Sequence, residues 1–265
     1  MSTVELTVDG HAVHAATGGA PVDRAAPCVV FLHGAGMDHT AFAFQTRYFA
    51  FRGRRCLALD FPGHGQSRGP TLPTIAAMAD WVVRVMDAAQ VETAALVGHS
   101  MGSLVALSCA ARHPTRVRAL GLIGTALAMR VSPALLDAAA ASDPAATAMV
   151  NLWGFGPRAG RGGAEAPGVW MTGAGDRLLA RSAPGVLAAD LAACDAYDSA
   201  AVDAAAVACP TRIVQGARDM MTPLKSARAL AAVLPGATLS DIPEAGHMTM
   251  IESAEATRVA LTSVV

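Results

Sequence analysis

Short apolar runs alternate along this chain with longer segments in which apolar residues recur every third or fourth position. The run 28–32 is apolar throughout, which is typical of a strand buried on both faces. The segment 74–89 places Ile75, Met78 and Val82 at helical spacing, which predicts an amphipathic helix. The same criteria predict strands at 4–8, 12–15, 55–59, 94–97, 117–123, 211–214 and 238–242, and helices at 42–52, 101–112, 223–233 and 253–262.

Strands that alternate with helices of this length predict an α/β protein with a mostly parallel central sheet and helices on both faces. The first two predicted strands flank Asp9 and Gly10, a dipeptide that favours a tight hairpin. We therefore predict that an antiparallel N-terminal hairpin is added to the edge of the parallel sheet.

The alternation stops between 125 and 206, where no segment has a convincing strand pattern. Helical spacing is found there at 133–141 and 186–197. A stretch of roughly 80 residues is too long for a loop in a compact domain. We expect it to form a helical cap, inserted into a core domain that consists of 1–124 and 207–265. The cap should cover the carboxyl ends of the strands, where open α/β sheets bind ligands.

A candidate nucleophile follows the strand predicted at 94–97. The sequence Gly-His-Ser-Met-Gly at 98–102 matches the pattern G-x-S-x-G and lies between a predicted strand and a predicted helix. In that context the serine stands on a sharp, strained turn with its hydroxyl exposed at the end of the sheet. The hydroxyl also faces the positive end of the helix dipole. We predict Ser100 as a catalytic nucleophile.

A serine hydroxyl is a poor nucleophile at neutral pH, so it needs an imidazole base, and the base needs a carboxylate that fixes its tautomer. Asp219 and His247 each follow a predicted strand, so both side chains can converge on Ser100. The chain order serine, aspartate, histidine is the order of one known class of such triads. We predict these three residues as the catalytic triad.

An oxyanion hole is expected beside this triad. The sequence His-Gly-Ala-Gly at 33–36 follows the strand 28–32, at the place where a second backbone N–H is needed. We predict the N–H groups of Ala35 and Met101 as the two donors. His33 is interpreted as a residue that orients this loop, not as a base.

These motifs resemble those of the α/β-hydrolase fold family, and the resemblance covers nearly the whole chain. Residues 60–67, Asp-Phe-Pro-Gly-His-Gly-Gln-Ser, are similar to a structural loop of that family, and 216–223 are similar to its acid-bearing turn. The resemblance implies an esterase-like serine hydrolase with a helical cap and no cofactor. The sequence also lacks a motif with metal-ligand spacing, so we expect no metal.

The expected substrate is a small-to-medium apolar carboxylic ester, cleaved through an acyl-enzyme intermediate. Ser100 stands where haloalkane dehalogenases and epoxide hydrolases of this fold have aspartate. Enol-lactone hydrolysis, carbon–carbon bond hydrolysis, cofactor-free haloperoxidase or perhydrolase activity, and a triad-bearing ligand receptor remain open alternatives. The cap carries no motif that identifies the substrate. The candidate substrate-binding residues are Gly34, His39, Trp153, Phe155 and Met248.

Charge and composition narrow the range of partners. The 265 residues include 20 lysines and arginines and 21 aspartates and glutamates, a formal charge of −1 that argues against nucleic-acid binding through a broad basic field. The longest uncharged apolar stretch, 93–111, is interrupted by polar residues where a membrane span should be most apolar. We expect a cytoplasmic enzyme with a small-molecule substrate and neither a signal peptide nor a membrane anchor. The oligomeric state stays open, with a homodimer as one alternative.

Overall fold

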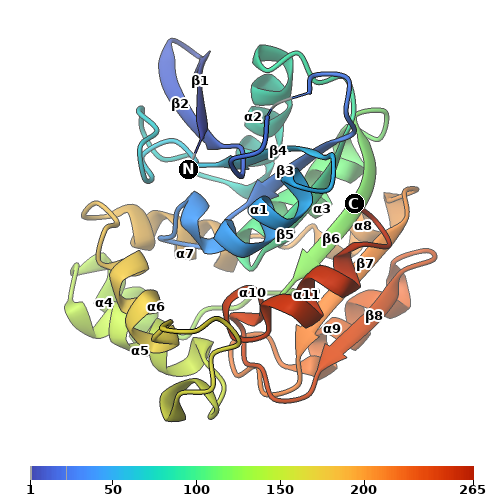
Figure 1. Cartoon of the computed structure of the whole chain (residues 1–265). Coiled ribbons are helices and arrows are strands. Elements are labelled where there is room, and N and C mark those ends of the chain that lie inside the picture. Colours follow the sequence, from blue (N-terminus) through green and yellow to red (C-terminus); the bar gives the residue numbers. More distant parts are fainter. Residues whose placement is uncertain (1, 22) are drawn as a thin grey trace.

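The computed structural model of the chain describes residues 2–21 and 23–265. Within these residues the centre of the molecule is an eight-stranded sheet with the order β1-β2-β4-β3-β5-β6-β7-β8 (Figure 1). The strands are β1 (Thr3–Val8), β2 (His11–Ala16), β3 (Cys28–Leu32), β4 (Arg55–Leu59), β5 (Ala94–His99), β6 (Val117–Ile123), β7 (Thr211–Gly216) and β8 (Thr238–Ile242). The hairpin β1–β2 is antiparallel, and β2 also pairs antiparallel with β4. The remaining neighbours in the sheet, from β4 through β3 and β5 to β8, all pair in parallel. The predicted α/β fold with an N-terminal hairpin at one edge is confirmed.

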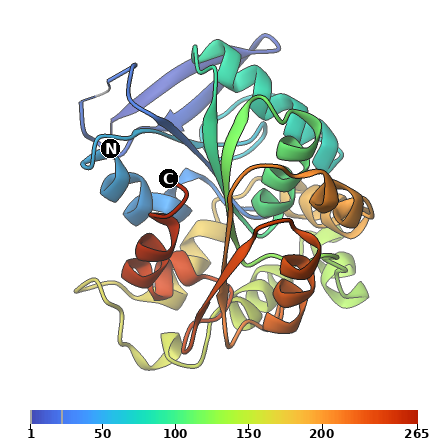
Figure 2. The same cartoon turned by 90° about the vertical axis from the view of Figure 1, so that its right-hand side faces the viewer.

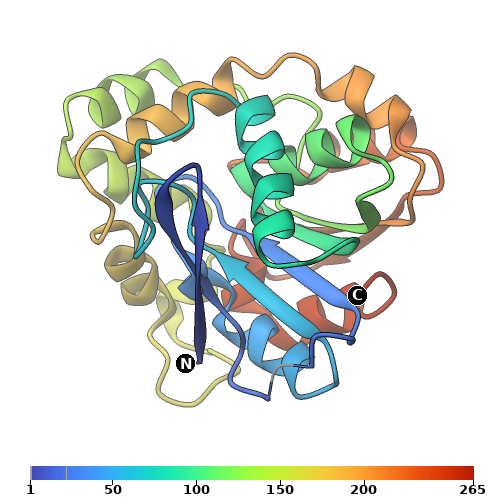
Figure 3. The ribbon, with the colours of Figure 1, turned by 90° about the horizontal axis from the view of Figure 1, so that it is seen from above.

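Helices pack on both faces of this strongly twisted sheet (Figures 2 and 3). One face carries α2 (Ile75–Ala88), α3 (Met101–Arg112), α8 (Ala200–Ala206) and α9 (Leu224–Val233). The other carries α1 (Ala43–Ala50), α10 (Thr249–Glu252) and α11 (Ala254–Leu261), with the 3₁₀ helix η1 (His39–Phe42) before α1. The central strands β3 and β5 are buried at every position because both faces of the sheet are covered.

The segment 125–206, which we call the helical insertion, leaves the sheet after β6 and returns at β7. It contains α4 (Pro133–Ala140), α5 (Pro144–Gly154), the 3₁₀ helix η2 (Ala159–Arg161), α6 (Met171–Leu179), α7 (Val186–Asp195) and α8. Helices α4 and α7 were predicted from their spacing. Helix α8 packs on α3 against the face of the sheet, apart from α4, α5 and α6.

The sequence did not predict helices α5 and α6. Helix α5 begins with a side-chain cap, in which Asp143 accepts a hydrogen bond from the N–H of Ala145, and proline follows at the first helical position. Helix α6 contains Gly173 and Gly175, which lower helix propensity. A Cβ on Gly175 would collide with the side chains of Asn151 and Phe155, so tertiary packing explains the glycine.

The parallel pairing of β3 to β8 brings the carboxyl ends of these strands to one edge of the sheet. The loops that follow β3, β5, β7 and β8 all start there. No helix in the described part of the chain is long and apolar enough to cross a membrane.

Candidate active site

Ser100 stands on the turn between β5 and α3, with φ 52° and ψ −119°. This is a conformation that a residue with a Cβ adopts only under strain. The two flanking glycines are required by close contacts: a Cβ on Gly98 would collide with the carbonyl oxygen of Gly102, and one on Gly102 with the carbonyl oxygen of Leu32. The glycines of the G-x-S-x-G pattern therefore allow the helix to start directly against the sheet.

His247 and Asp219 come from the loops after β8 and β7 and meet at the same edge. The Nδ1 atom of His247 lies 2.8 Å from Oδ2 of Asp219, and both side chains are buried. The other ring nitrogen, Nε2, is buried and has no hydrogen-bond partner among the residues that the structure describes. His247 and Ser100 line the same cavity.

Both oxygens of the Asp219 carboxylate accept hydrogen bonds from neighbouring residues. Its Oδ1 atom accepts hydrogen bonds from the backbone N–H groups of Met221 and Thr222, each 2.8 Å long. Its Oδ2 atom accepts from Gln215 Nε2 at 2.7 Å and from Thr222 Oγ1 at 2.8 Å. Burial alone would raise the pKa of Asp219, but the charge and hydrogen bond of His247 and the bonds from Thr222 lower it below its usual range.

Gln215 and Thr222 are functional candidates that the sequence analysis missed. Thr222 Oγ1 also lies 3.1 Å from Nδ1 of His247. The Oε1 atom of Gln215 accepts a hydrogen bond of 3.1 Å from the backbone of Thr125, where the helical insertion begins. Both residues lie in or directly beside the acid-bearing segment 216–223, so their proximity in sequence was the available signal.

Of the two predicted oxyanion donors, Met101 follows Ser100 directly in the chain and Ala35 lines the same cavity as Ser100. Met101 is the first residue of α3. In the described residues neither backbone N–H is hydrogen-bonded to a protein acceptor. Both groups are free to donate to a bound molecule.

The cavity beside Ser100 has a volume of about 320 Å³, within the range of small-molecule sites. More than half of its lining residues belong to the helical insertion, and most of them are apolar, such as Leu135, Val150 and Leu191. Arg130 is the charged exception from the insertion, and it is exposed and donates to the carbonyl oxygen of Asp195.

Of the five candidate substrate-binding residues, Trp153 lines this cavity and the other four are not among its lining residues. Gly34 lies against the ring of His99, whose Nδ1 would be 2.8 Å from an added Cβ. Phe155 lines a separate groove, and Met248 is fully buried. The sequence alone could not tell which residues near the motifs face the cavity, because this depends on the tertiary packing of the loops and of the insertion.

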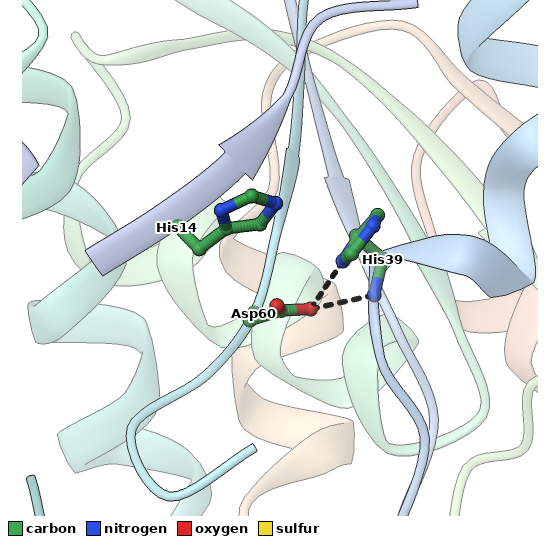
Figure 4. Close-up of side chains that lie close together, drawn as sticks. All are labelled: His14, His39 and Asp60. Carbon is green, nitrogen blue, oxygen red and sulfur yellow. Dashed lines mark hydrogen bonds and ion pairs between the residues drawn. The ribbon is translucent and has the colours of Figure 1, made fainter. Parts of the chain in front are cut away.

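His39, the fifth candidate, belongs to a buried group with His14 and Asp60 (Figure 4). The backbone N–H and the Nδ1 atom of His39 lie 2.7 and 2.9 Å from Oδ1 of Asp60, and Gln66 N–H donates to Oδ2 at 2.9 Å. Nδ1 of His14 contacts Glu5 at 2.6 Å. These residue types could ligate a metal, but the hydrogen bonds already occupy the carboxylate oxygens, so the group is explained as a junction between β2, η1 and the loop after β4.

A second buried carboxylate, Glu252 on α10, ties the His247 loop to the insertion. Its Oε1 atom accepts from the N–H of Gly246, and its Oε2 atom accepts from the N–H of Gly156, both at 2.9 Å. The N–H of His247 donates to the carbonyl of Gly154 at 2.8 Å. Burial raises the pKa of Glu252, against the lowering effect of these N–H groups. The sequence analysis did not point to Glu252. One of its partners, Gly156, is far away in the sequence, and a glycine near it, such as Gly246, is too common to serve as a signal.

A model of the alpha/beta hydrolase fold family matches residues 27–254. The chain belongs to this family. As an α/β hydrolase it is 33% identical, over 228 residues, to a pimeloyl-[acyl-carrier protein] methyl ester esterase from Chromobacterium violaceum, with 83% of this chain and 87% of that protein covered. It is 30% identical over 249 residues to a 2-hydroxymuconate semialdehyde hydrolase from Pseudomonas sp. strain CF600, with coverage of 85% and 82%.

The fold also matches a solved structure, the enol-lactonase from Burkholderia xenovorans LB400. The TM-score is 0.85 at 24% sequence identity, and 98% of each chain is covered. At that identity the likeness shows the fold alone.

Proposed function

We propose that this α/β hydrolase is a serine esterase that cleaves small-to-medium apolar carboxylic esters with Ser100, His247 and Asp219 as its triad. The observation that carries the proposal is how the two ring nitrogens of His247 are bonded. Asp219 holds Nδ1, while Nε2 is buried and has no hydrogen-bond partner among residues 2–21 and 23–265. His247 lines the cavity that Ser100 also lines. Relatives named as esterases support the choice of an ester bond.

In the first half of the proposed reaction, Nε2 of His247 takes the proton from Ser100 Oγ as this oxygen attacks the ester carbonyl carbon. The carbonyl oxygen becomes an oxyanion and accepts hydrogen bonds from the N–H groups of Ala35 and Met101. The imidazolium then gives its proton to the alcohol oxygen as the bond from that oxygen to the carbonyl carbon breaks. An acyl group remains on Ser100.

In the second half, a water molecule loses a proton to His247 and attacks the acyl carbon. The same two N–H groups hold the oxyanion again. The ester bond to Ser100 Oγ breaks, Oγ recovers the proton from His247, and the carboxylic acid leaves. Asp219 stays ionised throughout, in keeping with its lowered pKa, and stabilises the imidazolium in both halves.

We further propose that α4 to α7 of the helical insertion act as the cap over this site, with the core formed by the remainder of the chain. Their support is the cavity wall, to which they contribute Leu135, Val150, Trp153, Leu187 and Leu191. The apolar wall suits the apolar acyl or alcohol group of an ester and does not suit a charged one.

The proposal is tested with p-nitrophenyl butanoate and a fluorophosphonate probe. We expect Ser100→Ala to lose hydrolysis and labelling. Ser199→Ala is the matched control, because Ser199 is exposed at the start of α8 and does not line the cavity. Wild-type hydrolysis that persists in Ser100→Ala would overturn the assignment. A panel that includes lactones and carbon–carbon substrates then tests the choice of bond.

A further inference from the structure

A fully buried aspartate reaches from the helical insertion to the loop that carries Ala35. Asp190 lies in the middle of α7, and its Oδ2 atom accepts a hydrogen bond of 2.8 Å from the backbone N–H of Gly36. The same oxygen lies 2.8 Å from Nε2 of His64. Asp190 therefore joins the insertion to two loops at the carboxyl edge of the sheet, those after β3 and β4.

The contact between Asp190 and His64 is an ion pair. Nδ1 of His64 lies 3.0 Å from the carbonyl oxygen of Pro62, which can only accept, so Nδ1 carries a proton. Nε2 faces the carboxylate, so both ring nitrogens donate and the ring is an imidazolium. Burial alone would lower the pKa of His64, but the hydrogen bond and charge of Asp190 offset this effect and raise it.

The neighbouring histidine is held in the opposite state. The ring of His33 lies 4.9 Å from that of His64. His33 Nδ1 donates to the carbonyl of Gly34 at 2.9 Å, and Nε2 accepts from the N–H of Phe61 at 3.2 Å, so the ring is neutral. Burial and the charge of His64 lower the pKa of His33 to about 4. The positive charge beside the 33–36 loop is therefore localised on His64.

Burying a charge costs free energy even when the charge is paired, and the cost is offset only where hydrogen bonds satisfy the remaining polar atoms. The other oxygen of Asp190, Oδ1, is buried without a partner in the described part of the chain, so Oδ2 alone makes the two contacts. Buried ion pairs add little net stability compared with apolar packing, and in some proteins they specify one conformation instead. Here the conformation in question is that of the residue next to Ala35.

We propose that Asp190 is a positioning residue that fixes the 33–36 loop, so that the N–H of Ala35 faces the cavity as an oxyanion donor. This rests on the esterase function proposed above. The link acts through one peptide: Asp190 holds the N–H of Gly36, whose peptide plane is joined to Cα of Ala35. The insertion thereby contributes to the geometry of catalysis as well as to the wall of the cavity.

The test compares Asp190→Asn with Asp190→Leu. An asparagine that places its Oδ1 where Asp190 has Oδ2 keeps the acceptor for the N–H of Gly36, whereas leucine keeps only the volume. We expect Asp190→Asn to stay within about threefold of the wild-type kcat. We expect Asp190→Leu to lose at least about tenfold in kcat with little change in KM, because removal of a whole oxyanion donor costs ~10²–10³.

Arg181→Gln is the matched control. Arg181 also links the insertion to the core, because its exposed side chain pairs at 2.7 Å with the buried Asp38. Its hydrogen-bond partners, Asp38 and Thr40, lie outside the 33–36 loop. We expect its kcat to be unchanged within about twofold, because the loss of this ion pair leaves the N–H of Gly36 bonded to Asp190.

A second measurement, amide hydrogen exchange at Gly36, does not depend on turnover. We expect faster exchange in Asp190→Leu and wild-type protection in Asp190→Asn. Unchanged Gly36 protection in a folded Asp190→Leu protein would overturn the positioning role, whatever the enzyme's activity. If the wild type hydrolyses esters through Ser100 and Asp190→Leu keeps its kcat, the inference fails while the proposed function stands. If esters are not hydrolysed at all, the proposed function and the catalytic half of the inference fail together.

Discussion

The Nε2 atom of His99 donates a hydrogen bond of 3.1 Å to the backbone carbonyl oxygen of His247. The donor is assigned by chemistry, since a carbonyl oxygen can only accept. His99 directly precedes Ser100, so this bond ties the turn of the proposed nucleophile to the loop of the proposed base. Burial, followed by the charge of His247, lowers the pKa of His99 well below its ordinary value, and the ring stays neutral. It can therefore position His247 without competing for its proton.

Replacing His99 should weaken catalysis through the position of His247. In His99→Phe the carbonyl of His247 loses its donor, and we expect kcat to fall about threefold to tenfold, the equivalent of one ordinary hydrogen bond. Steady-state kinetics with p-nitrophenyl butanoate measures the change. His99→Gln restores a donor at similar reach and should recover most of the rate. Equal kcat values for the phenylalanine variant and the wild type would contradict this role.

Thr222 should affect the ionised state of the triad. Its hydroxyl donates to Asp219 at 2.8 Å and lies 3.1 Å from Nδ1 of His247. Thr222→Val keeps the shape but removes the donor, so the carboxylate is less well stabilised. Hydrogen bonds to charged groups contribute about 1.5–3 kcal/mol, and we expect a loss of that order in the free energy of unfolding, with kcat about tenfold lower.

The control for this change is Thr222→Ser, which keeps the hydroxyl and should behave like the wild type in both measurements. Urea denaturation and kinetics at neutral pH check the two effects. A valine variant with wild-type stability and rate would show that Asp219 is sufficiently held by its remaining donors, among them Gln215.

Local sequence patterns were enough for the fold and for the placement of Ser100, Asp219 and His247. Each lies next to a strand with a clear apolar run, and parallel pairing brings the ends of such strands together. Asp190 and Glu252 could not be found in this way, because each carboxylate binds a backbone N–H group far away in the sequence, that of Gly36 for Asp190 and that of Gly156 for Glu252. Every residue except proline has a backbone N–H, so the residue type does not show which N–H groups bind a carboxylate.

The lining of the cavity was harder to predict for a related reason. Its wall comes from α4, α5 and α7, and the sequence alone does not state how these helices pack on one another. Trp153 was found because it is large and apolar, whereas Leu135, Val150 and Leu187 look like any core residue. His39 was predicted as a pocket residue because it follows the 33–36 loop, but its ring is bonded to Asp60 and does not line the cavity.

Leu187 should limit the length of the substrate. It lines the cavity beside Ser100 and also a surface groove of about 310 Å³ between α4, α5, α6 and α7. The side chain therefore separates the two spaces. We expect Leu187→Ala to raise kcat/KM for p-nitrophenyl decanoate and dodecanoate relative to butanoate, because the longer chain gains a path into the groove.

The matched control is Leu135→Ala, which enlarges the cavity without opening the groove, since Leu135 lines the cavity alone. Both variants should lose about 2–5 kcal/mol of stability, as buried leucine-to-alanine changes do. The chain-length profile, normalised to butanoate, separates them. A profile shifted equally in both variants would mean that cavity volume, not the Leu187 barrier, sets the preference.

The depressed pKa of His33 should make the fold sensitive to acid. Its pKa is about 4 in the folded protein, where burial has the largest effect, against 6.5 for the free side chain. Between these values the unfolded chain binds a proton that the folded chain does not, so stability is complete above pH 6.5 and falls as the pH drops towards 4. The difference corresponds to about 3 kcal/mol for this residue.

We expect His33→Gln, whose side chain does not titrate, to lose roughly that much less stability than the wild type over the same range. Urea denaturation at several pH values gives the slopes, and the NMR titration of the His33 ring gives the pKa directly. A ring that titrates near its ordinary value in the folded protein would refute the prediction.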